Sequence, residues 1–467
     1  MNTAQARTQT SPSGRINRVG MTTRAREGEW FAREGVDPLS EAFERKRAVH
    51  AGMGGGMVTG EEALQLHAAL MERPRQGKSA VYVHIPFCET KCIYCGFYIA
   101  PYRKEVSASY TDALLDEMRR ERGRAAVGRE PVHAVYLGGG TPTALEPKDL
   151  ERLLRGIREN MPLANDCEIT VEGRIHNFGP EKMRAAVEGG ANRFSIGVQT
   201  FHTRLRQSLG RVCSRREVTT ALERLLAMDT AAVVVDLIYG LPGQTMRSWE
   251  EDMRTFESLG LDGCDLYQLN VFPGGKLDRA LKSGAAAPVA DIPMQSRMFR
   301  RGVELMTDMR AARLSISHWG RTARERNIYN PLMKSRADCL AYGAGAGGCL
   351  QGHFCFMTAD PSDYMARSRA GEKPLAGVAR PPLQLALMRS LSEQLERGWL
   401  DLPRATRAAG FDAGAEFDPL LRQWERAGLL TRRRNRVDLT LAGQFWQVNL
   451  VQGLLDWHMH NQKEESI

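Results

Sequence analysis

The sequence lacks the long apolar runs of a membrane protein and has few acidic residues at its start. No apolar run approaches the roughly 20 residues that a membrane-spanning helix requires, and no signal-peptide core follows Met1. The first acidic residue is Glu27, although arginines are interspersed from Arg7 onward. Such a polar stretch has little to bury, so we predict a disordered tail over residues 1–28, although a targeting presequence has a similar composition.

The composition of the whole chain is that of a soluble globular protein, with 42% hydrophobic and 25% charged residues. Its 467 residues are too many for one ordinary domain and predict two or three. The net charge of +9 indicates an anionic partner, such as nucleic acid, an acidic redox protein or a carboxylate-bearing substrate. A solvated basic surface explains the same charge without any partner.

A fourth cysteine is missing from the most informative stretch of the chain. Val81–Ile85 is typical of a short apolar strand that stops at Pro86, and the loop that follows carries Cys88, Cys92 and Cys95. Three thiolates at this spacing can bind a soft metal centre, and a cubane held by three cysteines keeps one iron open. Structural zinc is the alternative, but it usually needs a further Cys or His nearby. The triplet therefore favours an open [4Fe–4S] cluster.

Short apolar runs alternate with amphipathic helical patterns from Ser79 onward. Repeated β–α units form parallel sheets, so the predicted fold class is α/β, and six units indicate a partial (β/α)6 barrel. Such barrels carry their chemistry at the carboxyl ends of the strands. The predicted strands are Val81–Ile85, His133–Leu137, Glu168–Val171, Arg193–Val198, Ala232–Ile238 and Cys264–Val271.

The rest of the chain is divided around this barrel. We predict an N-terminal extension over residues 29–76, the barrel over 77–290, a substrate region over 291–375 and a C-terminal helical, winged-helix-like domain over 376–467. The C-terminal domain contains the basic residues Arg432, Arg433, Arg434 and Arg436, which would also fit a DNA-binding winged helix.

Polar residues follow several of the predicted strands. The glycines of Gly138–Thr143 (GGGTPT), after the second strand, let the backbone approach an anionic ligand closely. Glu172 ends the third strand, Gln199 ends the fourth, and Asp236 lies on the fifth. Arg211 follows the fourth strand. Each side chain alone could form an ordinary ion pair, but four of them near successive strand ends favour a cofactor site.

Together these motifs resemble the radical S-adenosylmethionine (SAM) enzymes. The YVHIPFC stretch from Tyr82 to Cys88 and the GGGTPT loop are similar to those of the coproporphyrinogen dehydrogenase branch. The resemblance implies two SAM molecules. Asn270 differs in residue type from the residue that the branch carries at the matching position. It assigns Tyr82, Tyr94, Gly139, Glu172 and Asn270 to the cluster-bound SAM, and Gly140, Thr141, Gln199, Arg211 and Asp236 to the second. It also implies catalytic roles for Tyr82, Gln199, Arg211 and Asp236, and a [4Fe–4S] cluster on Cys88, Cys92 and Cys95.

Phe97 is a second departure, because the dehydrogenases carry another cysteine at this position. The stretches DPLSEAF from Asp37 and SHWGRT from Ser317 are similar to the anaerobic haem-degrading radical SAM methyltransferases, the anaerobilin synthases. This resemblance covers the chain from about Trp30 onward. It implies that one SAM yields a 5′-deoxyadenosyl radical, which activates the methyl group of the second SAM. Addition to haem then opens the macrocycle without oxygen, and a methylated linear tetrapyrrole and iron are released.

The resemblance also implies partners. Haem is the expected substrate, and the electron donor would be a flavodoxin or a flavin reductase. A haem-delivery or product-reducing protein is a further partner of such an enzyme. A radical enzyme has little need to read DNA, so we expect no nucleic-acid partner and no membrane partner. An oxygen-sensitive cluster and unpaired thiols fit a reducing cytoplasm, where we expect the protein.

The expected haem contacts lie after the barrel. Haem iron accepts His, Cys or Tyr, although such histidines are often core or capping residues. Guanidinium binds carboxylate bidentately, so nearby arginines could hold the propionates, or they could form a solvated helix face. The candidate haem contacts are His318, Tyr329, Cys349, His353 and Cys355, with Arg321, Arg324 and Arg326 for the propionates. Cys339, Cys349, His353 and Cys355 could instead form a metal site.

Two other functions stay open. An oxygen-independent coproporphyrinogen dehydrogenase would use the same cofactors, but Phe97 argues against it. A haem chaperone of the same branch would bind haem without turning it over. The HN-x-x-YW haem motif of those chaperones is absent from the sequence.

Overall fold

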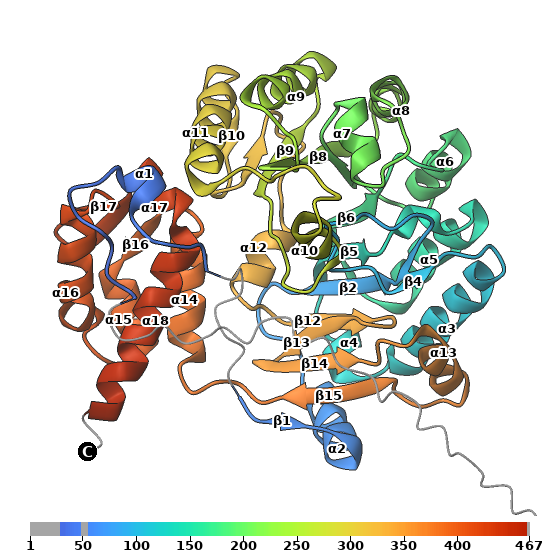
Figure 1. Ribbon diagram of the computed structural model, residues 1–467. Coiled ribbons are helices and arrows are strands. Elements are labelled where there is room, and N and C mark those ends of the chain that lie inside the picture. Colours follow the sequence, from blue (N-terminus) through green and yellow to red (C-terminus); the bar gives the residue numbers. More distant parts are fainter. Residues whose placement is uncertain (1–28, 48–54, 465–467) are drawn as a thin grey trace, which may run out of the picture.

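The computed structural model describes residues 29–47 and 55–464, in which a large mixed sheet is joined to a smaller C-terminal unit (Figure 1). The disordered tail predicted for residues 1–28 lies outside the described residues. No helix in the described ranges is both long enough and apolar enough to cross a membrane.

Six parallel strands in chain order form the centre of the sheet. They are β2 (Ala80–Ile85), β5 (Val132–Gly139), β6 (Leu163–Gly173), β7 (Arg193–Gln199), β8 (Ala232–Tyr239) and β9 (Gly263–Gln268). Each overlaps one of the strands predicted from the sequence. The predicted α/β fold class with a partial (β/α)6 barrel is confirmed.

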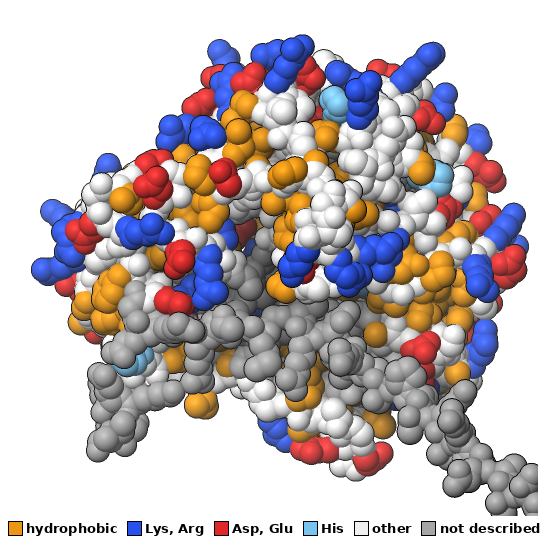
Figure 2. All heavy atoms as spheres, viewed as in Figure 1, with side chains coloured by type: hydrophobic (Ala, Val, Ile, Leu, Met, Phe, Trp, Pro, Cys, Tyr) orange, Lys and Arg blue, Asp and Glu red, His pale blue; other side chains and the backbone are white. Residues whose placement is uncertain are grey.

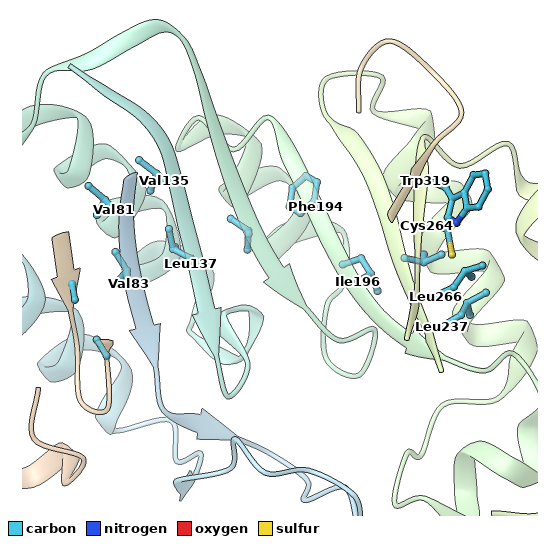
Figure 3. Packing of buried hydrophobic residues seen from close by; sticks show 14 of the residues in the cluster. Val81, Val83, Val135, Leu137, Phe194, Ile196, Leu237, Cys264, Leu266 and Trp319 are labelled. Atoms are coloured by element: carbon cyan, nitrogen blue, oxygen red, sulfur yellow. The ribbon is translucent and has the colours of Figure 1, made fainter. Parts of the chain in front are cut away.

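Helices follow these strands and lie mainly around the outer face of the sheet (Figure 1). Alternate strand residues are apolar and belong to the main core, as Val81, Val83, Val135 and Leu137 do in Figure 3. The helices are α3 (Val106–Glu121), α4 (Ala125–Gly128), η1 (Pro142–Ala144), α5 (Pro147–Asn160), α6 (Pro180–Glu188), α7 (Thr203–Ser208), α8 (Arg215–Ala227), α9 (Met246–Leu259), α10 (Lys276–Lys282) and α11 (Ile292–Asp308).

Both edges of the parallel core are extended by strands that the sequence did not predict. Beyond β2 come β12 (Cys339–Tyr342), which is parallel to it, and then the antiparallel strands β13 (Gly347–Leu350), β14 (His353–Met357), β15 (Leu375–Ala379) and β1 (Met57–Val58). Beyond β9 come β11 (His318–Gly320), which is antiparallel to β9, and β10 (Ala312–Arg313), which is antiparallel to β11. Within the described part of the chain the sheet has 13 strands and is not closed. Helices α2 (Gly60–Met71) and α13 (Pro361–Arg369) accompany the β12–β15 side. The domain boundaries predicted from the sequence stay predictions.

A short helix, α12 (Tyr329–Lys334), covers part of the inner face of the barrel. Its residues Tyr329, Leu332 and Met333 pack on Ala80 of β2 and Ala134 of β5. The Glu168 carboxylate on β6 accepts hydrogen bonds from the backbone N–H groups that begin α12, at 3.0 to 3.2 Å. Since Ala80 begins β2, α12 lies at the amino ends of the strands and forms the floor of the barrel interior.

A buried ionic network fixes the segment that leads to this floor. His318 lies between two carboxylates, with Nδ1 2.8 Å from Asp265 and Nε2 2.9 Å from Glu325. Glu325 also forms a buried ion pair with Arg193, the first residue of β7, at 2.9 Å. Burial opposes the imidazolium charge, but Asp265 and Glu325 outweigh it and raise the pKa of His318 to about 9.

The C-terminal unit combines helices with a three-stranded antiparallel sheet, as the predicted winged-helix-like domain requires. The described start of the chain packs on this unit, because Trp424 and Trp446 donate their indole N–H groups to the carbonyls of Trp30 and Pro38, at 2.9 and 3.1 Å. The unit contains α14 (Leu385–Leu395), β16 (Trp399–Asp401), α15 (Leu402–Ala409), α16 (Ala413–Arg426), β17 (Leu430–Arg433), β18 (Arg436–Leu439), α17 (Leu441–Phe445) and α18 (Gln447–Glu464), and α1 (Pro38–Glu41) lies against it.

We predict that the protein loses stability as the pH rises from about 6.5 to about 9 because His318 loses its proton. The group is held charged in the folded state, so its contribution is complete below the unfolded pKa of 6.5 and is lost through about 9. The difference corresponds to about 3 kcal/mol at most. Thermal unfolding measured across this range tests it. His318→Gln should unfold at a lower temperature at pH 7 and show a flatter pH dependence; an equally steep dependence in this variant would assign the effect to another group.

Candidate active site

The three cysteines lie on a loop at the carboxyl end of β2, at the edge that barrels use for chemistry. Two short parallel strands, β3 (Phe87–Cys88) and β4 (Ala100–Pro101), close the base of this loop. The loop also rests on the segment after β7, since the backbone N–H of Ile93 donates to the carbonyl of Leu209 at 3.2 Å. Cys88 and Cys92 are buried, and Cys95 is half-buried.

Hydrogen-bond donors point at two of the sulfurs. The Thr141 hydroxyl donates to Cys88 Sγ at 3.3 Å, and the Phe97 backbone N–H donates to Cys95 Sγ at 3.3 Å. Burial raises the pKa of both thiols, and these donors oppose it by favouring thiolate. Within the described ranges no three His, Cys, Asp or Glu side chains converge on a single metal ion. Three thiols in one loop, two of them with hydrogen-bond donors, fit the protein ligands of a cluster.

The glycine loop after β5 packs directly against the strand that leads to the cysteines. A Cβ on Gly139 would lie 2.6 Å from the His84 ring, and one on Gly140 would lie 2.6 Å from the Phe87 carbonyl oxygen. Gly139 also has a φ of 108°, which side chains rarely adopt. Larger residues would push the loop away from β2, so the glycines are required for this close approach.

Two carboxylates face the inside of the barrel, Glu172 at the carboxyl end of β6 and Asp236 in the middle of β8. Glu172 accepts a hydrogen bond from the Gly139 backbone N–H at 3.1 Å, and Asp236 accepts one from the Ser195 hydroxyl at 3.4 Å. Burial and the neighbouring Asp236 raise the pKa of Glu172 to about 8. Burial and Asp265 raise that of Asp236 to about 7. Neither carboxylate forms an ion pair in the part of the chain that the structure describes, so the pair suits a cationic ligand.

The end of β7 brings two more predicted residues beside the cysteine loop. Arg211 donates from Nε to the Tyr94 hydroxyl at 3.0 Å and from Nη1 to the Gly197 carbonyl. Gln199 adopts a left-handed φ of 70° where the register with β8 shifts, and its buried Oε1 has no hydrogen-bond partner among the described residues. A strained backbone and an orphaned buried oxygen at a strand end are typical of a ligand site.

The remaining predicted site residues, Tyr82 and Asn270, differ in how deep they lie in the barrel. The Tyr82 hydroxyl lies 2.9 Å from His84 Nδ1, and burial raises the pKa of Tyr82. Asn270 is exposed just beyond the end of β9. The resemblance assigns Tyr94 to the cluster-bound SAM and Arg211 to the second SAM. The hydrogen bond between them shows that residues of the two predicted sites are in direct contact. The structure thus brings most of the predicted cofactor residues to the carboxyl end of the barrel, with Asn270 at its rim and with Tyr82 and Asp236 deeper inside.

Most of the candidate haem contacts lie elsewhere. His318 is clamped between two carboxylates, which leaves neither ring nitrogen for an iron. Arg321, Arg324 and Arg326 contact Glu257, Asp229 and Asp166, at the amino ends of the strands. These three arginines lie at the end of the barrel opposite the cysteine loop, and the propionate role predicted for them stays a prediction.

The proposed cysteine and histidine metal site is also not assembled. Cys339 and Cys349 face the same side of the sheet, since they are directly opposite in the β12–β13 register. Cys349 pairs with Phe354, so His353 and Cys355 point to the other side. Tyr329 is the candidate that the structure places inside the barrel.

Sequence reasoning missed several residues of the inner face. Arg193, Tyr136 and Asp265 lie on predicted strands, two or more residues before the strand ends where ligands were sought. Their alternation with apolar residues in the sequence was the available signal, because it marks the polar face of a strand. Glu325 carried no such signal, since its partners come from distant parts of the chain.

Comparisons with known proteins agree with this geometry. Residues 82–256 match the model of the Radical SAM superfamily. The chain is 39% identical to the anaerobilin synthase of Escherichia coli O157:H7, over 91% of this chain and 94% of that protein. It is 32% identical to the heme chaperone HemW of Bacillus subtilis (strain 168), over 59% of this chain and 72% of that protein.

A solved structure gives the same fold. The coproporphyrinogen III oxidase (HemN) from Escherichia coli, described as a radical SAM enzyme, superposes with a TM-score of 0.73 at 21% identity. The superposition covers 85% of this chain and 93% of that one. The anaerobilin synthase match extends over nearly the full length of both proteins, whereas the chaperone match does not. The chain therefore belongs to the anaerobilin synthase family of radical SAM enzymes.

Proposed function

We propose that this protein is a radical SAM C-methyltransferase that opens the haem macrocycle without oxygen. The products are a methylated linear tetrapyrrole and free iron, and two SAM molecules are used, one for the radical and one for the methyl group. The observation that carries the proposal is the 39% identity to an anaerobilin synthase over 91% of the chain. Haem is the substrate, and a flavodoxin or a flavin reductase is the electron donor.

The cofactors of a radical SAM enzyme are a [4Fe–4S] cluster and SAM. When bound, they supply the one-electron cleavage of SAM that begins the chemistry. In our proposal Cys88, Cys92 and Cys95 hold three irons, and the absence of a fourth cysteine leaves one iron for SAM. The Thr141 hydroxyl, 3.3 Å from Cys88 Sγ, stabilises that sulfur as thiolate.

The protein's own residues hold and orient the two sulfonium ligands. Glu172 accepts the ammonium group of the cluster-bound SAM, and the glycine loop lets that ligand approach β5 closely. Asp236 and the free Oε1 of Gln199 lie on the next strands and contact the second SAM. The Arg211–Tyr94 hydrogen bond ties the cysteine loop to β7, so the two ligands keep a fixed separation.

The alternative functions have weaker support. Phe97 is 68% exposed and stands where the dehydrogenase branch has a cysteine, so coproporphyrinogen oxidation lacks that thiol. The likeness to heme chaperone HemW covers 59% of the chain, compared with 91% for the anaerobilin synthase.

Anaerobic turnover with haem and methyl-labelled SAM tests the proposal. The reconstituted, reduced protein should bleach the Soret band of haem and give an opened tetrapyrrole that carries the label. Cys92→Ala should bind no cluster and leave haem intact, whereas Cys167→Ala, which removes a buried thiol outside the loop, should retain the reaction. An intact Soret band with unlabelled haem, from protein that holds about four irons per chain, would refute the methyltransferase assignment.

We also predict that SAM binds more tightly as the pH rises toward 8. A cationic ligand needs Glu172 as carboxylate, and its pKa of about 8 leaves it largely protonated at pH 6. Equilibrium dialysis with labelled SAM measures this dependence. Glu172→Gln should weaken binding of the cluster-bound SAM by about tenfold at pH 8 and remove the pH dependence of that site, whereas any dependence at the second site follows Asp236, whose pKa is about 7. Glu188→Gln, which removes a charge from the outer face of α6, should change neither; loss of the pH dependence in that control instead would point away from Glu172.

A further inference from the structure

Three tyrosine rings stand above the floor of the barrel. Tyr136 of β5 and Tyr329 of α12 are stacked, with centroids 4.4 Å apart and planes 23° from parallel. Tyr82 of β2 lies 6.3 Å from each of them, at 25° and 27°. The three planes are therefore nearly parallel, although the residues come from two strands and a helix.

These rings line the inside of the barrel instead of filling a sealed core. Burial raises the pKa of all three hydroxyls, yet each side chain keeps part of its surface accessible. Side chains that are surrounded by protein and still accessible line a concave surface. Figure 2 shows the molecule hollowed between the barrel and the C-terminal unit.

The tyrosines are also next to the SAM residues. Glu172 is two residues beyond Thr170, the strand neighbour of Tyr136, and its charge raises the pKa of Tyr82, Tyr136 and Tyr329 further. The rings therefore lie between the Glu172 carboxylate at the mouth and the floor formed by α12. A planar aromatic molecule that packs on them would lie directly below the proposed SAM site.

An anionic group could not point toward Glu172 and Asp236, but the other end of α12 is basic. Arg336 follows α12 and lies over the Phe354 ring, 5.1 Å from its centroid. Arg389 of α14 donates to the Arg336 carbonyl at 2.7 Å, and its buried Nε has no hydrogen-bond partner in residues 29–47 and 55–464. Tyr329 begins α12, and Arg336 lies two residues beyond its end with a left-handed φ of 51°. Aromatic rings and guanidinium groups thus occur at the two ends of one short segment.

We propose that the haem macrocycle packs against Tyr136 and Tyr329, with its propionates directed toward Arg336 and Arg389. The proposal rests on haem being the substrate, as argued above. It assigns α12 a role as the substrate platform, and it makes separate predictions for the flat ring and for the carboxylates of haem.

Haem titration of the cluster-containing protein without SAM, followed by the Soret band, tests the aromatic half. Tyr329→Leu and Tyr136→Leu should each raise the Kd by about tenfold, whereas Tyr329→Phe keeps the ring and should stay within about twofold. Phe31→Leu, on the C-terminal unit, removes an exposed aromatic ring elsewhere and should not change the Kd. SAM binding and the thermal unfolding midpoint identify variants that have not folded.

Unchanged affinity in both folded leucine variants would overturn the platform. If the wild-type protein consumes haem while the variants bind it normally, only this inference fails. If the wild-type protein neither binds nor consumes haem, the proposed function fails first.

The propionates are tested with haem and its dimethyl ester, in which both carboxylates are masked. Arg389→Gln should weaken haem binding by about tenfold and ester binding by no more than about twofold, because only the free acid has carboxylates for the guanidinium. Arg397→Gln, which removes a cation from the end of α14, should change neither. Equal loss for haem and ester in Arg389→Gln would overturn the propionate assignment, as would no loss for either.

Discussion

The structure depends on how the polar side chains on the inner face of an open barrel find partners for their charges and hydrogen bonds. The parallel strands carry Arg193, Glu168 and Asp265 on their inner side, where charges cannot be left without partners. The segment between β11 and β12 supplies those partners: His318 and Glu325 complete the ion pairs, and the start of α12 gives its N–H groups to Glu168. Polar groups of the strands thus determine where the floor of the barrel lies.

The contrast between the two ends of the interior locates the functional site. In the deeper part, Arg193 and His318 form ion pairs of about 3 Å with Glu325 and Asp265, and Glu168 accepts backbone N–H groups at the start of α12. Among the described residues Glu172, at the carboxyl end of β6, forms no ion pair, nor does Asp236 in the middle of β8, and Gln199 keeps an orphaned oxygen. The raised pKa values of Glu172 and Asp236 therefore mark buried carboxylates that the cations of the chain compensate only in part, which is a usual condition of a ligand site.

The sequence was sufficient to predict the features that depend on a local pattern of residues. The six strands, the cysteine loop and the GGGTPT turn each lie within one short stretch, and all were predicted. The flanks of the sheet were missed because β12 to β15 are four or five residues long and are stabilised by distant partners. His318 was misassigned for a related reason, since a lone histidine gives no sign of which carboxylates will meet it. Tyr136 was overlooked because a tyrosine inside a strand is an ordinary β-former.

The connection between β11 and β12 also explains how an unclosed barrel can hold a precise interior. β11 pairs with β9 at one edge of the parallel core, and β12 pairs with β2 at the other. The chain between them crosses the inside, so the floor is anchored to both edges that a closed barrel would join directly. Tyr329 lies in the middle of this crossing and takes its position from both sides. A substrate packed there would take its position relative to the cysteine loop from these two strand pairings, β11 with β9 and β12 with β2.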